Sequence, residues 1–237
     1  MLWPFINLIQ AIIVSIWTAL WASIGFIIWV LTLGSQKHPM IVSHFWGPGL
    51  IWISGSRITV IGKENIVSDK NFIYCANHES LMDIPAVFTA VNVNLYFVAK
   101  RELQKIPFLG WFMTMVGMIF IDRGNKERAY ESMRRAGQLI KGGKNVISFP
   151  EGTRNKDGKM RVFKRGSFIM AQAGEISVVP IAIKGAREIL PSGKFKMRPG
   201  HIIVKIGQPI SGESYKENVD AFANAVREKV IEMRNSI

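Results

Sequence analysis

The first 36 residues of this 237-residue chain carry no charged side chain, and residues 2–33 are almost wholly apolar. About 20 apolar residues suffice to cross a bilayer, whereas a secretory signal has a basic start and a far shorter apolar run. The run therefore predicts a membrane-inserted helix and not a cleaved leader.

A second apolar stretch, residues 40–54, is interrupted by His44 and by Gly47-Pro48-Gly49. It is too short and too broken to predict a second crossing, so a hairpin of two helices within one leaflet fits as well as a span. We expect residues 1–55 to form this membrane-inserted hairpin and residues 56–237 to form one globular domain.

The chain has 30 Lys and Arg residues against 17 Asp and Glu, a net charge of +13, and every basic residue lies from Lys37 onward. Positive charge next to an apolar segment favours the cytoplasmic side of a membrane, so we expect the globular domain there. The same excess favours anionic partners, which include nucleic acid, phosphorylated substrates and anionic lipid.

Short β-prone segments alternate with amphipathic helical segments after residue 56, which predicts an α/β fold with a sheet flanked by helices. Strands are expected at residues 57–62, 72–76, 95–99, 117–121, 145–149, 178–183 and 201–207. Helices are expected near residues 82–91, 126–141, 166–173 and 215–235, the last with a cap near Ser214.

His78 follows the apolar segment 72–76, and Asp83 stands where the next helix is expected to begin. A histidine can exchange a proton near neutral pH, and a carboxylate can hold its second ring nitrogen. Because residues five apart point about 140° away from each other on a helix, the pair can touch only if His78 lies in the turn. The alternative is a turn histidine beside a carboxylate that favours the helix dipole.

Two further strands are followed by polar groups, Arg123 after one and Glu151 to Arg154 after the other. Carboxyl ends of parallel strands share one edge of an α/β sheet, where ligands bind. The fork of an arginine suits phosphate, and Gly152 would let a ligand approach the backbone. The basic run 154–165 either binds an anion or is a solvated loop, and each arginine alone could be merely ion-paired.

Other chemistries lack their residues in this sequence. There is no Gly-x-Ser-x-Gly motif, Cys75 is the single cysteine, and no His or Cys cluster has metal-ligand spacing. The segment 137–145 has the wrong spacing for a phosphate-binding loop. Ser80 stands too close to His78 to use it as a base, so a covalent acyl-serine is not expected.

Four blocks of this sequence resemble, in order and separation, those of the glycerolipid acyltransferase family. They are Asn77-His78-x4-Asp83 (an HX4D motif), Phe120-Ile-Asp-Arg123, Phe149-Pro-Glu-Gly-Thr-Arg154 and Val179-Pro180-Ile181. The segments Ala99–Leu103 and Phe163–Gly166 resemble secondary family features. The resemblance covers about residues 57–210 and is closest to the bacterial members that acylate 1-acylglycerol-3-phosphate.

The resemblance implies a mixed sheet of about seven strands and transfer of a fatty acyl group, from acyl-CoA or acyl-carrier protein, to the sn-2 hydroxyl of 1-acylglycerol-3-phosphate. The product would be phosphatidic acid, made in phospholipid biosynthesis at the cytoplasmic side of a bacterial inner membrane, with anionic membrane lipids as partners and no cofactor. His78 would be the general base and Asp83 its partner. The expected substrate-binding residues are Lys100, Arg123, Glu151, Gly152, Thr153 and Arg154.

Three other functions compete with this interpretation. The first is an acyltransferase of the same family with another acceptor, such as lyso-ornithine lipid or a different lysophospholipid. The second is a membrane-bound nucleic-acid-binding protein, but no recognisable nucleic-acid module supports it, so no nucleic-acid partner is expected. The third is a non-catalytic lipid-binding relative, which the intact pair His78 and Asp83 argues against.

Overall fold

The globular domain is built on one twisted sheet. The computed structural model describes residues 2–35, 41–67, 70–107, 109–122, 125–155, 157–193 and 195–237. These residues contain seven strands: β1 (Arg57–Ile61), β2 (Ile73–Ala76), β3 (Leu95–Lys100), β4 (Ile119–Ile121), β5 (Asn145–Ser148), β6 (Val178–Lys184) and β7 (His201–Ile206). Each lies where the sequence predicts a strand, which confirms the α/β fold.

The strand order is β1-β7-β6-β2-β5-β3-β4. The five strands from β6 to β4 are parallel to their neighbours, β7 is antiparallel to β6, and β1 is parallel to β7. The sheet is therefore mixed, as expected. The carboxyl ends of β2, β5, β3 and β4 follow one another along one edge, which is where an α/β sheet binds ligands.

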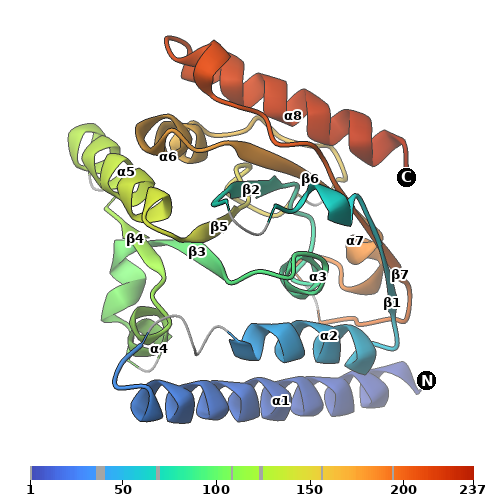
Figure 1. The fold of residues 1–237 in the computed structure, drawn as a ribbon. Helices are drawn as coiled ribbons and strands as arrows, with labels where there is room; N and C mark the ends of the chain where they lie inside the picture. Colours follow the sequence, from blue (N-terminus) through green and yellow to red (C-terminus); the bar gives the residue numbers. More distant parts are fainter. Residues whose placement is uncertain are drawn as a thin grey trace.

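Helices cover both faces of the sheet (Figure 1). The helices on one face are α5 (Lys126–Lys141), α6 (Gly166–Gly174) and α8 (Val219–Asn235). Those on the other are α3 (Asp83–Ala90), α4 (Leu109–Met115) and α7 (Ala186–Ile189). Short 3₁₀ helices, η2 (Lys63–Asn65), η3 (Arg101–Lys105) and η4 (Glu213–Tyr215), lie in the connections.

The expected start of the last helix is wrong by four residues. Helix α8 begins at Val219, and the side chain of Asn218 caps it by accepting a hydrogen bond from the Ala221 amide at 2.9 Å. Asparagine is as good a cap as serine, and the segment around Ser214 forms η4 instead.

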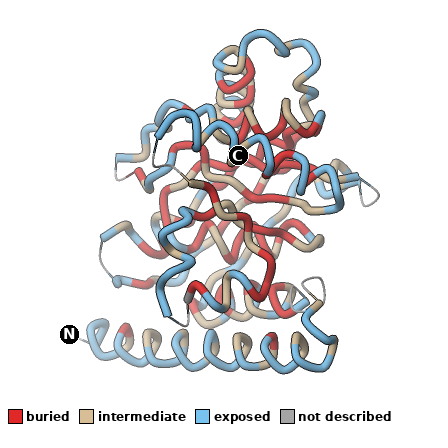
Figure 2. Tube along the Cα trace, turned by 90° about the vertical axis from the view of Figure 1, so that its left-hand side faces the viewer, coloured by how far each residue is buried: buried red, intermediate tan, exposed pale blue. Residues whose placement is uncertain are grey.

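The core lies between the helical layers, along the central strands (Figure 2). Every residue of β2 is buried, and β6 is buried from Val178 to Ile183. A strand that is covered on both faces needs a continuous apolar run instead of an alternating one, and both strands have such a run. These two strands therefore give the site a rigid base.

Helices α1 (Trp3–Leu31) and α2 (Ser43–Ile53) form an antiparallel pair outside these layers, with α1 outermost (Figure 1). Trp17 donates to the Trp46 carbonyl at 3.2 Å and lies so close to Gly49 that a Cβ there would come within 2.2 Å of its ring. The sequence Gly47-Pro48-Gly49 thus lies inside a helix and permits close helix packing.

Large apolar side chains are exposed along the length of α1, among them Phe5, Leu8, Ile16 and Leu31. Figure 2 shows that much of this helix is exposed. Within the described residues, α1 is the one helix long and apolar enough to cross a membrane, by length and composition alone. Its first turns join the globular domain, because Asn7 donates to the Met197 carbonyl at 2.9 Å and accepts from Arg198 at 3.0 Å.

Candidate active site

His78 and Asp83 meet in the turn between β2 and α3. The His78 Nδ1 lies 2.8 Å from the Asp83 Oδ2, and Asp83 is the first residue of α3. His78 precedes the helix, which is the condition that the five-residue spacing imposes. Since Nδ1 is occupied by the carboxylate, Nε2 is the nitrogen left to accept a proton.

One oxygen of Asp83 gathers three N–H donors. Besides His78, the backbone amides of Glu79 and Ser80 donate to its Oδ2 at 2.7 and 2.8 Å. The Asp83 side chain is 1% exposed, so these donors replace the water that a surface carboxylate would bind. Its place in the first turn of α3 also gives a negative charge the favourable end of the helix dipole.

The turn is also bonded to the neighbouring strand β6 and to the segment after α7. Asn77 donates to the Ile183 carbonyl at 2.9 Å and accepts from the Ile183 amide at 2.8 Å, which extends the pairing of β2 with β6 by one side chain. Ser80 donates its hydroxyl to the Leu190 carbonyl at 2.7 Å. That hydroxyl belongs to the scaffold of the turn, in keeping with the expectation that Ser80 is no nucleophile.

Glu151 links the end of β5 to the end of β2. Its Oε1 accepts from the His78 amide at 2.8 Å, and its Oε2 accepts from the Arg161 amide at 2.9 Å and from the Asn155 side chain at 3.1 Å. The backbone amide of Asn155 in turn donates to the His78 carbonyl at 2.9 Å. Glu151 is 2% exposed. These contacts give it a role in holding the histidine backbone, and its expected role in binding acceptor stays a prediction.

Phe149 supports the imidazole ring. Its ring lies 4.2 Å from the His78 ring, centroid to centroid, with 21° between the planes. Together with Asp83 this contact fixes the ring on one face and at one nitrogen. From the sequence, Phe149 is predicted only as part of a motif. Its place directly after β5, beside the strand that precedes His78, was the available signal.

Gly152, Thr153 and Arg154 form the start of the basic loop, whose described residues are 152–155 and 157–165. Gly152 has a φ of +76°, a left-handed conformation that favours glycine, and a Cβ there would come within 2.6 Å of the Lys164 Nζ, so a larger residue would also displace that lysine. Thr153 accepts from Arg161 at 3.3 Å. Arg154 is half-buried, and the structure records no ion pair for it within the described part of the chain. The loop therefore gathers positive charge next to His78.

Two further predicted residues belong to the same edge of the sheet. Lys100 is the last residue of β3, the strand beside β5, and its side chain is exposed. Arg123 lies outside the described residues. The residue before it, Asp122, pairs with Arg101 at 3.0 Å. The edge thus presents His78, the basic loop and Lys100 in that order.

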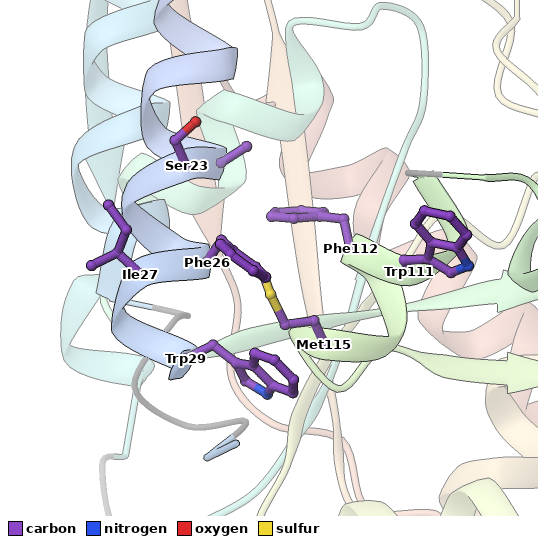
Figure 3. A pocket seen from close by; sticks show the side chains of 8 residues that line it. Ser23, Phe26, Ile27, Trp29, Trp111, Phe112 and Met115 are labelled. Carbon is purple, nitrogen blue, oxygen red and sulfur yellow. The ribbon is translucent and has the colours of Figure 1, made fainter. Parts of the chain in front are cut away.

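An apolar groove lies apart from these residues, between α1 and α4 (Figure 3). Its volume is about 760 Å³. Phe26 of α1 and Met115 of α4 point toward each other across it. The lining residues are Ala22, Ser23, Phe26, Ile27, Trp29, Trp111, Phe112 and Met115. Its apolar lining fits hydrocarbon better than a polar ligand.

Residues 57–184, which include His78, Asp83, Glu151 and Arg154, match the acyltransferase family. The chain belongs to the acyltransferase family. A solved structure of an acyltransferase, the 1-acyl-sn-glycerophosphate (LPA) acyltransferase PlsC from Thermotoga maritima, is similar with a TM-score of 0.80 and 30% identity. The similarity covers 98% of this chain and 96% of that one, so it includes the two N-terminal helices.

Several sequence relatives carry the name 1-acyl-sn-glycerol-3-phosphate acyltransferase, and three of them show the extent of the similarity. That of Chlamydomonas reinhardtii is 32% identical over 84% of this chain and 60% of its own length. That of Saccharomyces cerevisiae is 32% identical over 77% and 61%, and that of Borreliella burgdorferi is 35% identical over 56% and 53%. The chain thus spans roughly half to three fifths of the length of these curated acyltransferases.

The contacts of Glu151 predict a loss of stability on substitution. Glu151→Gln keeps the volume but replaces one accepting oxygen with an amide that faces N–H donors. Leaving a buried donor unpaired costs about 1–3 kcal/mol, so the free energy of unfolding should fall by about that amount. Denaturant unfolding measures it, with Thr153→Ala, an exposed neighbour, expected to change by less than about 0.5 kcal/mol. Equal losses in both variants would contradict the role of Glu151.

Proposed function

We propose that this protein transfers a fatty acyl group from a thioester, acyl-CoA or acyl-carrier protein, to the sn-2 hydroxyl of 1-acylglycerol-3-phosphate, which yields phosphatidic acid. The observation that carries the proposal is the 2.8 Å contact between His78 and Asp83 at the ligand-binding edge of an acyltransferase sheet. The names of the relatives, and of the similar solved structure, support the acceptor.

The chemical step needs one base. The His78 Nε2 removes the proton of the acceptor hydroxyl as its oxygen attacks the thioester carbonyl carbon. The new bond is an oxygen–carbon ester bond, and the bond that breaks is the carbon–sulfur bond. The proton then passes from His78 to the leaving thiolate. Asp83 holds the Nδ1 proton and stabilises the imidazolium that forms, so no metal, cofactor or acyl-enzyme is required.

The phosphate of the acceptor would lie on the basic loop. Arg154 and Arg123 present guanidinium forks that match phosphate oxygens, and Lys100 adds a point charge at the next strand end. Gly152 lets the ligand approach the backbone, and Thr153 offers a hydroxyl. Glu151 would contribute by fixing the loop and His78, or by meeting a glycerol oxygen.

The N-terminal helices would hold the enzyme in the membrane that contains its acceptor and product. A straight helix of 29 residues is about 44 Å long, against a hydrocarbon core of about 30 Å, so α1 must tilt or lie partly in the interface. Pro48 frees a backbone carbonyl inside α2, which favours shallow insertion over spanning. The site would then face anionic head groups at the cytoplasmic surface of a bacterial inner membrane.

The first functional prediction concerns the base. His78→Ala should abolish formation of labelled phosphatidic acid from labelled acyl-CoA and 1-acylglycerol-3-phosphate. Asp83→Asn should lower kcat by about 10⁴, the cost of a misoriented imidazole in catalytic triads. Thin-layer separation of the products measures both. Exposed Lys229→Ala on α8 serves as the control, and near-normal turnover by folded His78→Ala would refute the assignment.

The second functional prediction concerns the acceptor. Arg154→Ala should raise the KM for 1-acylglycerol-3-phosphate by roughly tenfold or more, because a lost charge-assisted hydrogen bond costs about 1.5–3 kcal/mol. The KM for acyl-CoA should change much less, and Arg123→Ala should behave alike. Steady-state rates with each substrate varied in turn measure this. Equal effects on both substrates would move the arginines to the donor side or to a structural role.

The third functional prediction concerns the membrane. High salt alone should fail to release the full-length protein from membranes, whereas detergent should release it, because the apolar face of α1 outweighs charge attraction. Single cysteines along residues 2–54, in a Cys75→Ser background, would report depth by labelling. Native Cys75 is fully buried, and burial raises the pKa of its thiol to about 12, so the native thiol should contribute little labelling of its own. Labelling of the first residues from the outer face of cells would show a crossing and refute the one-leaflet hairpin.

A further inference from the structure

Two arginines of α8 contact the basic loop and the turn that carries His78. Arg227 and Arg234 are seven residues apart, so they project from nearly the same face of the helix. Arg227 donates to the carbonyls of Met160 and Arg161 at 3.0 and 2.9 Å, and Arg234 donates to the carbonyl of Gly158 at 3.0 Å. The last helix of the chain therefore holds the backbone of the basic loop.

Arg234 also reaches the turn that carries His78. Its Nη2 lies 2.6 Å from the Glu79 Oε1, and the Glu79 side chain is 8% exposed. The contact is an ion pair without the alignment of a hydrogen bond. Burial raises the pKa of Glu79, while the neighbouring Arg234 acts to lower it. Removing the partner of a buried carboxylate strongly destabilises the folded protein, because the charge is left unpaired. We therefore expect the position of Glu79 to depend on Arg234.

Glu79 directly follows the catalytic histidine in the chain, and its backbone amide is one of the groups that donate to Asp83. Its own amide donates to the Asp83 Oδ2 at 2.7 Å, directly beside the bond from His78. The loop under the two arginines also returns to the histidine, because the Arg161 amide binds Glu151, which accepts from the His78 amide. Helix α8 therefore contacts both the turn with the base and the loop with the expected phosphate site.

We propose that Glu79 and Arg234 are positioning residues for acyl transfer: their ion pair sets the catalytic turn relative to the basic loop by fixing both to α8. The role rests on the proposed function, in which His78 is the base. Neither side chain needs to touch substrate. A misplacement of about 1 Å can cost about 10² in rate, so a pair that acts only through its neighbours can still control kcat.

The test compares the full-length enzyme in mixed micelles with the variants Arg234→Met, Arg234→Lys, Glu79→Gln and Glu79→Gln/Arg234→Met. Arg234→Met should lower kcat about tenfold or more, with the KM for acyl-CoA changed by less than about twofold. Arg234→Lys should restore part of kcat, because it keeps the charge but not the fork. The double variant should have a higher kcat than Arg234→Met, since it leaves no unpaired buried charge.

The matched control is Lys229→Met, which breaks an exposed pair with Glu232 on the same helix and should keep the wild-type kcat. Amide hydrogen exchange of the peptide 77–83 gives a readout that needs no activity, and exchange should speed up in Arg234→Met but not in Lys229→Met. If Arg234→Met does not fold, Glu79→Gln decides the case by the same two measurements.

A wild-type kcat together with unchanged exchange in the Glu79 or Arg234 variants would overturn the positioning role. A lowered melting temperature without any change in kcat would do so too. An inactive wild-type enzyme would instead refute the proposed function, and the exchange measurement would still show whether α8 controls the turn.

Discussion

The site depends on one carboxylate oxygen that accepts three N–H donors. The Oδ2 of Asp83 binds the imidazole of His78 and the amides of Glu79 and Ser80, all at 2.7–2.8 Å. Two of these bonds fold the chain into the turn, and the third orients the ring within it. The same interaction therefore shapes the backbone and prepares the base. Because the carboxylate is buried at the start of α3, water cannot replace these donors, and the ring has one orientation.

The sheet decides what lies beside this base. Strand β5 is the neighbour of β2, so the basic loop that follows β5 must begin next to His78. Glu151 makes that adjacency rigid by accepting from the amides of His78 and Arg161. Strand β3 then brings Lys100 to the far side of the loop. A base and a row of cations at one edge form the arrangement that a reaction on a phosphate-bearing alcohol needs.

The sequence predicted all seven strands and the longer helices, because continuous apolar runs such as Ile73–Ala76 and amphipathic runs such as Lys126–Lys141 carry strong local patterns. Helices α4 and α7 were missed, since seven and four residues are too short for a periodic signal. The contact between His78 and Asp83 could be predicted only on the condition that the histidine precede the helix. The pair Glu79 and Arg234 joins residues 155 positions apart, so only the folded chain shows it.

Local pattern therefore identified the candidate base and cations, while tertiary contacts assigned Phe149, Asn155 and α8 to their support. The central claim is that the acceptor hydroxyl attacks the thioester directly with His78 as base. Initial rates with acyl-CoA and 1-acylglycerol-3-phosphate both varied test it most directly. The account predicts phosphatidic acid as product and intersecting lines in the double-reciprocal plots, because both substrates must be bound together. Parallel lines, the signature of a covalent acyl-enzyme, or no phosphatidic acid at all would contradict it.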